Sequence, residues 1–409
     1  MLALLKLSWR SIWRNRRRTL LTVGSTAAAL AVAVLFLAIA DGMYGRLLYD
    51  VLRLQAGNLT VENAEHLDAP SVDLVLDDVP DLRRRIEALP GVSRTKQLVV
   101  GPGVANSGDG AVGTAVVGVE PSVEAAVSPL LRRIVHGEYL DDADDRSVLV
   151  GAEMARRLKL EVGNKVVLST NDVRGQLVSE LVRVKGIFKT GAVELDGHYV
   201  QVPIGFARKL FGMRDAQATE VGILLSDAEQ QDSVLAAVQG VIAQDERAAV
   251  WPWQKVLPEL SSFMKVDKGS NYVFQTIILL MAMFTVFNTV LMSALERKRE
   301  FAVMLALGTS PARVKLGLVL ESVLLGTVGA ALGVAAGCGL SVAVDGISLA
   351  GSMGKGMEVG GYLVEPVLHA SLSPRITVGL GLAMSAVIAL MSLVPMTRIS
   401  RIRVTDAFR

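Results

Sequence analysis

Four long apolar stretches constrain the fold of this 409-residue chain more than any other feature of its sequence. They cover residues 20–40, 272–295, 314–344 and 376–396. The apolar core of a bilayer is about 30 Å thick, and a helix of about 20 apolar residues is needed to cross it. A hydrophobic share of 51% and a mean hydropathy of +0.43 agree with a chain that lies partly in lipid. The sequence therefore predicts an integral membrane protein with four transmembrane helices.

The first apolar stretch also has features of a cleaved signal peptide. Basic residues precede it, and Ala38-Ile39-Ala40 resembles a small-residue cleavage site. Its uncharged segment of about 20 residues is longer than the roughly 7 to 15 apolar residues of a typical signal peptide. The length favours a membrane anchor that stays in the protein.

The distribution of Lys and Arg predicts the orientation of the spans. Cations gather before the first span, between the second and third, and after the fourth: Arg14, Arg16, Arg17, Arg18, then Arg297, Lys298, Arg299, Arg313, then Arg398, Arg401 and Arg403. Cytoplasmic loops carry an excess of such residues. We expect these segments and both termini in the cytoplasm.

The basic N-terminal segment has two helical faces. One face is apolar and the other is cationic, formed respectively by Leu2, Leu5, Trp9, Ile12 and by Lys6, Arg10, Arg14, Arg18. Such a helix lies on the cytoplasmic leaflet and contacts membrane lipids. The alternative is a disordered basic tail that only sets the topology.

The long segment between the first two spans has a soluble composition, and connections beyond about 15 residues without structure are uncommon. Helical patterns at 79–89 and 151–160 alternate with short strand patterns. These strand patterns cover residues 58–61, 72–76, 114–119, 165–169, 181–187, 199–202 and 220–225. The segment is predicted to be an extracytoplasmic α+β domain with two subdomains, the inner one inserted into the outer.

The predicted fold class is thus a membrane protein with four transmembrane helices and a large α+β domain inserted between helices 1 and 2. In chain order we expect a cytoplasmic amphipathic basic helix (1–19), transmembrane helix 1 (20–45), the extracytoplasmic domain (46–268), transmembrane helix 2 (269–295), a cytoplasmic helix (296–313), transmembrane helix 3 (314–344), an extracytoplasmic loop (345–374), transmembrane helix 4 (375–396) and a cytoplasmic tail (397–409).

Residues that usually carry chemistry form no recognisable motif in this sequence. The phosphate-binding string Gly-x-x-x-x-Gly-Lys-Ser/Thr and the Gly-x-Ser-x-Gly elbow are both missing. The histidines have no spacing typical of metal ligands; they are His66, His136, His198 and His369. A single cysteine, Cys338, excludes an intrachain disulfide. The sequence therefore predicts no catalytic, cofactor or metal site, and no nucleic-acid partner.

The third span carries small residues at a spacing of three and four, namely Gly326, Gly329, Gly333 and Gly337. Such a stripe lets helix backbones approach closely, either within one chain or between two chains. Two polar residues also lie within the spans, Asn288 and Glu321. Because an ionised group in lipid is costly, we expect Glu321 to form an ion pair with a neighbouring cation rather than to handle substrate or protons.

The segment after the second span combines charges with apolar residues at helical spacing. The charged residues are Glu296, Arg297, Lys298, Arg299 and Glu300, and the apolar ones are Phe301, Met304, Leu305 and Leu307. We expect a short helix on the cytoplasmic face that ends at Gly308 and docks into a groove of a soluble partner. The alternative is a simple turn whose cations only set the topology.

These residues resemble a known family, the FtsX-like or MacB-type permeases of ABC transporters. The string from Glu296 to Thr309 is similar to the family's coupling helix, which sits on the ATPase. Glu321 with the following glycines resembles its third transmembrane helix, and Asp406-Ala407-Phe408-Arg409 resembles its C-terminal end. Val150-Gly151-Ala152-Glu153 and residues 162–166 are similar to its periplasmic core domain.

The resemblance implies a permease of the bacterial inner membrane that has no ATPase activity of its own and pairs with a second permease copy, identical or paralogous. ATP and Mg²⁺ would be bound by partner ATPase subunits, and the coupling residues Glu296, Arg297, Arg299, Glu300, Leu305, Leu307 and Gly308 would pass their motion to the periplasmic domain. The fragment from Phe287 to Phe301 is closest to the lipoprotein-releasing (Lol) branch, which extracts lipoproteins from the outer leaflet and passes them to a periplasmic carrier. Alternatives are an efflux permease with a periplasmic adaptor and a transmembrane regulator of a cell-wall hydrolase.

Overall fold

The computed structural model describes residues 16–55, 57–348, 357–359, 362–364 and 367–399. The chain forms two compact units, one made of residues 1–45, 265–348 and 367–409 and the other of residues 46–264 and 349–366. Most of the predicted amphipathic helix at 1–19 and of the predicted tail at 397–409 lies outside the described residues.

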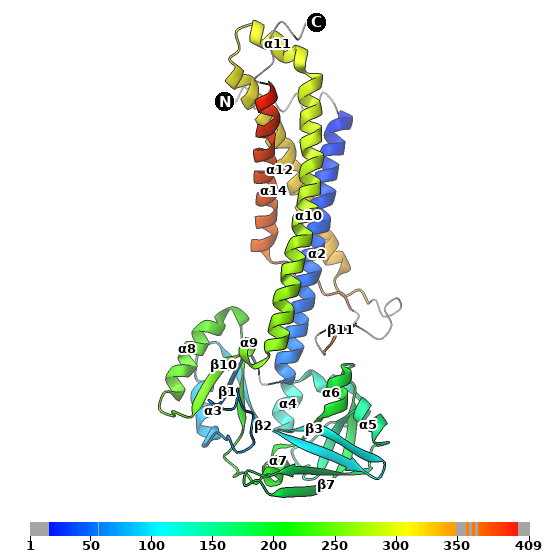
Figure 1. Cartoon of the computed structure of the whole chain (residues 1–409), viewed down its shortest axis with the longest axis vertical. Helices are drawn as coiled ribbons and strands as arrows, with labels where there is room; N and C mark the ends of the chain where they lie inside the picture. Colours follow the sequence, from blue (N-terminus) through cyan, green and yellow to red (C-terminus); the bar gives the residue numbers. More distant parts are fainter. Residues whose placement is uncertain (1–15, 56, 349–356, 360–361, 365–366, 400–409) are drawn as a thin grey trace. The chain divides into compact units, whose positions relative to one another are not determined.

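Four long helices build the first unit, and Figure 1 shows them side by side. They are α2 (Arg16–Leu54), α10 (Pro258–Glu296), α12 (Pro311–Val344) and α14 (Pro374–Ile399). The last three begin at a proline, whose missing N–H and fixed φ suit the first position of a helix. Three stretches are long and apolar enough to cross a membrane, Thr19–Leu54, Pro258–Thr289 and Pro311–Val344, and a shorter apolar helix covers Pro374–Leu390.

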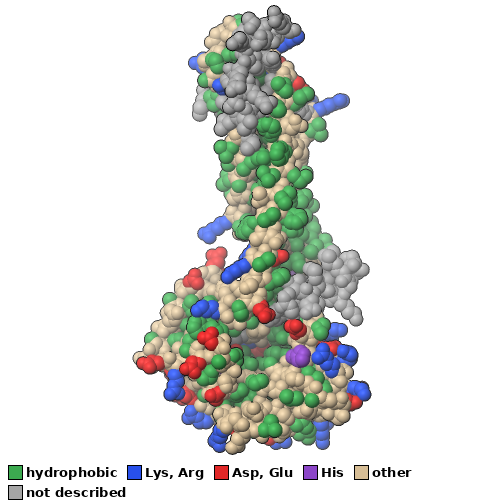
Figure 2. Space-filling view, viewed as in Figure 1, with side chains coloured by type: hydrophobic (Ala, Val, Ile, Leu, Met, Phe, Trp, Pro, Cys, Tyr) green, Lys and Arg blue, Asp and Glu red, His purple; other side chains and the backbone are tan. Residues whose placement is uncertain are grey.

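One apolar cluster joins all four helices. It contains Leu30 and Val34 of α2, Ala282 and Val286 of α10, Ala330 of α12, and Met384 and Ile388 of α14. Many large apolar side chains remain on the outer surface of this unit, and Figure 2 shows hydrophobic side chains along the helices. An apolar exterior around a packed interior is the arrangement expected of helices in lipid.

The second unit contains a ten-stranded sheet with the order β10-β1-β9-β2-β3-β8-β5-β7-β4, in which β6 pairs with β2 and β7. The strands are β1 (Leu59–Asn63), β2 (Val92–Ser107), β3 (Gly110–Val119), β4 (Ile134–Gly137), β5 (Ser147–Gly151), β6 (Lys165–Asn171), β7 (Leu177–Phe188), β8 (Tyr199–Pro203), β9 (Glu220–Leu225) and β10 (Ala248–Pro252). The helices are α3 (Val79–Glu87), α4 (Pro121–Val127), α5 (Ala152–Arg157), α6 (Val193–His198), α7 (Ile204–Phe211), α8 (Gln231–Ile242) and α9 (Trp253–Val256).

Strand β2 belongs to two portions of this sheet. Its first part pairs with β9 up to Leu98, and its second part pairs with β3 from Val99 onward. The outer portion contains β10, β1 and β9 and contacts α3 and α8, whereas the inner portion contains β3 to β8 and contacts α5 and α7. The inner portion is therefore a segment inserted between β2 and β9 of the outer portion (Figure 1).

Several local predictions differ from the structure. Residues 72–76 form a turn followed by one isolated bridge at Leu76 rather than a strand. The long strand β2 went unpredicted because Gly101, Pro102 and Gly103 are typical of a turn. A Cβ atom at Gly101 would lie 2.6 Å from the Phe211 ring, so this glycine makes room for α7. The fold class, apolar helices with an α+β domain inserted after the first helix, is confirmed.

Candidate functional site

The predicted helix between the second and third spans is α11 (Lys298–Ala306). One face packs on its own chain, because Phe301 is 4% exposed and Ala302 is fully buried. The opposite face leaves Val303, Met304 and Leu307 exposed, the last at 81%. A short helix with an exposed apolar face suits docking into a groove of a soluble protein.

The end of α11 is fixed by a left-handed glycine. Gly308 has φ +87°, a backbone conformation that residues with a Cβ rarely adopt. Its N–H donates to the Leu305 carbonyl at 3.1 Å, and the Thr309 N–H donates to the Met304 carbonyl at 3.0 Å. These two bonds form a Schellman motif, which stops the helix where the sequence predicted.

Arg297, directly before α11, ties this helix to α12. Its Nη1 donates to Glu321 Oε2 at 2.7 Å and its Nε donates to Glu300 Oε2 at 2.9 Å. The guanidinium also lies 5.3 Å from the centre of the Phe301 ring. Glu321 is 5% exposed, and the predicted ion pair with a neighbouring cation is confirmed. The buried charge of Glu321 on α12 is therefore balanced by Arg297, directly before α11.

The remaining predicted coupling and intramembrane residues occupy different environments. Glu296 and Arg299 are exposed, while Leu305 is half-buried. Asn288 is exposed on α10, so the structure does not bury it beside Glu321. Arg297 therefore forms an ion pair with the buried Glu321, whereas Glu296, Arg299 and Asn288 face outward.

The glycine stripe of α12 packs against helices of the same chain. An added Cβ would lie 2.7 Å from the Ala27 carbonyl oxygen at Gly333 and 2.7 Å from the Val34 Cβ at Gly337. Gly329 faces Thr26 of α2 at 3.0 Å, and Gly326 faces Ile388 of α14 at 2.7 Å. The sequence left open whether the stripe packs within one chain or between two chains, and the structure shows close packing within the chain. The stripe is covered by α2 and α14 and presents no open surface to a second copy.

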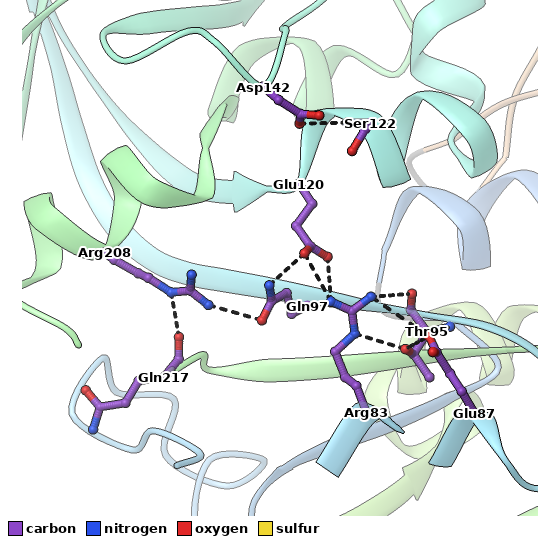
Figure 3. Close-up of polar contacts among 9 residues, drawn as sticks. All are labelled: Arg83, Glu87, Thr95, Gln97, Glu120, Ser122, Asp142, Arg208 and Gln217. Atoms are coloured by element: carbon purple, nitrogen blue, oxygen red, sulfur yellow. Dashed lines mark hydrogen bonds and ion pairs between the residues drawn. The ribbon is translucent and has the colours of Figure 1, made fainter. Parts of the chain in front are cut away.

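A network of hydrogen bonds and ion pairs joins the two portions of the sheet (Figure 3). Arg83 of α3 contacts both carboxylate oxygens of Glu120, at 2.8 and 3.1 Å. Gln97 of β2 donates to Glu120 at 2.8 Å and accepts from Arg208 of α7 at 3.1 Å. Arg83 also donates to the Thr95 hydroxyl at 3.0 Å. Because α3 belongs to the outer portion and α7 to the inner one, the network crosses between them.

Lys96, between Thr95 and Gln97 on β2, has one of the largest fully buried side chains in the described residues. Its Nζ donates to the Arg53 carbonyl at 2.7 Å and the Leu54 carbonyl at 3.4 Å, both in the last turn of α2. It also lies 3.4 Å from Glu124 of α4, which is equally buried. Burial lowers the pKa of Lys96 and raises the pKa of Glu124. The end of α2 is thus capped by a cation from the sheet.

A further cluster brings together Glu62 of β1, His66 in the following turn and Glu220 of β9. Their ligand atoms all lie within 4.8 Å of one another. Burial, together with the facing Glu220, raises the pKa of Glu62 to about 8, and burial raises the pKa of Glu220 to about 7. No sequence pattern predicted this cluster, because only the pairing of β1 with β9 brings Glu220 to the other two residues.

An apolar helix bundle, an inserted α+β domain and a short helix with an exposed apolar face between two spans are the features of a membrane permease of the ABC transporter class. Residues 272–404 match the family described as "FtsX-like permease C-terminal", and residues 19–241 match the "MacB-like periplasmic core domain". The chain belongs to the FtsX-like permeases that carry a MacB-like periplasmic core domain.

Similar proteins come from several branches of this family. The lipoprotein-releasing system transmembrane protein LolC of Neisseria meningitidis serogroup B is 24% identical over 328 residues, which cover 78% of this chain and 76% of that protein. The pyoverdine export ATP-binding/permease protein PvdT of Pseudomonas entomophila is 24% identical over 354 residues, 82% of this chain and 51% of that protein. The solved extracellular domain of the ABC-type transporter YknZ from Gram-positive bacteria is 18% identical, with a TM-score of 0.35 over 47% of this chain and 98% of that domain.

Family membership settles the coarse features of the protein. It is a multi-pass protein of the inner membrane with a periplasmic domain, and it has the four-span topology of the family. The matched regions are the permease and periplasmic parts, and a permease of this type works with a partner ATPase. The chain is therefore a permease subunit rather than an enzyme.

Proposed function

We propose that this chain transmits motion from a separate ATPase to its periplasmic domain and thereby extracts a lipoprotein, or another hydrophobic substrate, from the outer leaflet of the inner membrane. The observation that carries the coupling role is the geometry of α11. Its exposed apolar face can seat in the ATPase, while Arg297 joins its start to the buried Glu321 of α12 at 2.7 Å. A displacement of α11 would therefore be passed to the transmembrane helix rather than absorbed in a loose loop.

The orientation follows from the same proposal. Segments rich in Lys and Arg, including α11, lie in the cytoplasm with both termini, where the ATPase binds. Replacing Cys338 by Ala leaves a background without cysteine, because the sequence has no other. A membrane-impermeant maleimide should then label Ser226→Cys, in the periplasmic domain, in intact spheroplasts, and should label Thr309→Cys only after permeabilisation. Labelling of both positions in intact spheroplasts contradicts the proposed topology.

The lipoprotein substrate is supported by the similarity to a protein of the lipoprotein-releasing system. A second permease copy, identical or paralogous, and a periplasmic carrier complete the proposed assembly. The similarity to an export permease favours one alternative, efflux of a small molecule with a periplasmic adaptor.

Proteoliposomes that contain the permease, its second copy and the ATPase would distinguish the two substrates. With a fluorescent triacylated lipoprotein in the membrane, ATP should release lipoprotein into the supernatant when a soluble carrier is present. A diacylglycerol-free, soluble form of the same protein serves as the control, because it offers no acyl chains to extract. Failure of release, combined with ATPase stimulation by small amphipathic compounds, would favour efflux. Absence of any copurifying ATPase would contradict both.

A further inference from the structure

Two glutamates face each other across the first strand pair of the periplasmic domain. Glu62 of β1 and Glu220 of β9 are partners in the antiparallel register. Side chains directly opposite in such a pair have Cβ atoms roughly 4.5–5.5 Å apart and point to the same face, where like charges destabilise the sheet. Glu62 is only 3% exposed, so water does not screen the repulsion. The pair needs a cation or a proton between its members.

A histidine closes this cluster from the turn after β1. The turn is held by the His66 N–H, which donates to the Asn63 carbonyl at 2.9 Å, and the His66 side chain is 8% exposed. The Nδ1 atom of its ring is buried and has no hydrogen-bond partner. A buried imidazole nitrogen without a hydrogen-bond partner is available to bind a metal ion.

Unsatisfied polar atoms gather at the same place. Six buried side-chain polar atoms in the described residues have no hydrogen-bond partner, and those in this part of the sheet are Thr60 Oγ1, Glu62 Oε1, His66 Nδ1 and Trp251 Nε1. Thr60 pairs with Trp251 in the register and lies two residues before Glu62 on the same face of β1. Folded proteins leave few such atoms without partners, and a concentration of them indicates a missing ligand or ion.

Lys96, the neighbouring cation, does not take the place of a metal ion between Glu62 and Glu220. Lys96 is the cation that acts on Glu220, but its ammonium is bound by Glu124 and by the α2 carbonyls. The Lys96–Glu124 pair is neutral as a whole, so the charge of the ionised Glu62 and Glu220 carboxylates is left to be balanced by a divalent cation or, without one, by a shared proton. Two carboxylate oxygens and one imidazole nitrogen are ligands that Zn²⁺ and related first-row ions accept.

We propose that Glu62, His66 and Glu220 bind one divalent first-row transition metal ion, with Zn²⁺ as the ion that fits this donor set best. Ligands about 2.1 Å from one ion lie no more than about 4.2 Å apart, so small side-chain rotations within the 4.8 Å cluster close the site. The ion cross-links β1 to β9 and to the turn that follows β1. It is a structural clamp on the outer portion of the periplasmic domain.

The test uses the full-length chain, purified in detergent with a tag that contains no histidine and stripped with a chelator. After equilibrium dialysis against micromolar Zn²⁺, elemental analysis should find about one zinc per chain. Glu62→Gln, His66→Gln and Glu220→Gln should each weaken binding by at least roughly 100-fold, the upper end of what second-shell changes cause. The exposed residues His136 and Glu229 provide matched controls, and His136→Gln and Glu229→Gln should bind zinc as the unchanged chain does.

X-ray absorption of the zinc-loaded chain gives a readout that does not depend on the folding of any variant. The proposal requires one imidazole and oxygen ligands at about 2.0–2.2 Å, with no sulfur. If the unchanged chain binds no more zinc than the three ligand variants do, the proposal is overturned. A proton shared by Glu62 and Glu220 would then hold the two carboxylates together. Zinc that stays bound in all three variants, or a sulfur ligand from Cys338, also overturns the proposal.

Discussion

Replacing Lys96 by Met should loosen the end of α2 from the periplasmic domain. The substitution keeps the length and the apolar stem of the side chain but removes the ammonium that caps the carbonyls of Arg53 and Leu54. It also leaves Glu124, 1% exposed, without the cation at 3.4 Å. The loss therefore combines a helix cap with one partner of a buried ion pair.

The magnitude follows from the burial of this pair. At 3.4 Å and an effective dielectric constant of about 20, the gross attraction is about 5 kcal/mol. Removing one member of a buried pair typically costs about 3–5 kcal/mol, because the remaining charge stays desolvated. A loss of 3 kcal/mol corresponds to a factor of roughly 10² in a local opening equilibrium.

Hydrogen exchange measured by mass spectrometry on the full chain reports this opening directly. Peptides from residues 46–54 and 121–127 should exchange roughly 10²-fold faster in Lys96→Met, while peptides from α8 should be unchanged. Adding Glu124→Gln removes the desolvated charge, so the double variant should regain most of the protection. If the effects of the two substitutions on the exchange rates simply add, the loss of the ion pair is not the cause of the faster exchange and the reasoning is wrong.

The pH dependence of the same variant has a definite sign. Burial raises the pKa of Glu124 above its ordinary value of 4.5, and removal of Lys96 withdraws an interaction that lowers it. A raised carboxyl pKa means that the folded state binds the proton more tightly, so stability falls as pH rises from the ordinary value through the raised one. The defect of Lys96→Met should therefore shrink as the pH is lowered toward 4.5. A defect that grows on acidification would contradict this assignment.

Three further substitutions test the bundle, the coupling helix and the join within the sheet. Gly333→Leu should lower the melting temperature of the detergent-solubilised chain, because even a Cβ there meets an α2 carbonyl oxygen at 2.7 Å, whereas Gly339→Leu has open space and should not. Arg297→Met should lower ATP-driven transport more than ATP hydrolysis and leave membrane insertion intact, while Glu300→Gln, which removes a partly exposed pair, should have the smaller effect. Glu120→Ala should destabilise the periplasmic domain by about 2–3 kcal/mol in chemical unfolding, since it removes the carboxylate that accepts from Arg83 Nη1 and Gln97 Nε2, and an unchanged midpoint would refute a stabilising role of the network.

The sequence predicted the membrane spans and α11 because their determinants are local. Twenty apolar residues in one helix, a glycine at the helix end and adjacent charges act within a few residues of one another. The sequence predicted that a neighbouring cation pairs with Glu321 without saying which one, and the structure identifies this cation as Arg297. Strand β2 was not predicted, because Gly101-Pro102-Gly103 is typical of a turn, while the fold uses Gly101 to admit Phe211 of α7.

The metal-type cluster shows the limit of sequence reasoning most clearly. Glu62 and His66 are four residues apart, a spacing that is uninformative where a strand passes into a turn. Their third partner, Glu220, is brought near only by the register of β1 with β9. Strand register between distant segments is set by packing of the whole sheet, so no local pattern could have predicted the cluster.

Three consecutive residues of β2 connect the end of α2 to both portions of the periplasmic domain. Lys96 binds the last turn of α2, while its neighbours Thr95 and Gln97, which point to the opposite face of the strand, join the network with Arg83 and Glu120. Immediately after them β2 changes its partner from β9 to β3. A displacement of α2 delivered at this point would act on the outer and inner portions together, which is what transmission by a rigid body requires. If Glu120→Ala separated transport from ATP hydrolysis while Lys96→Met did not, the force would have to enter the domain by another route.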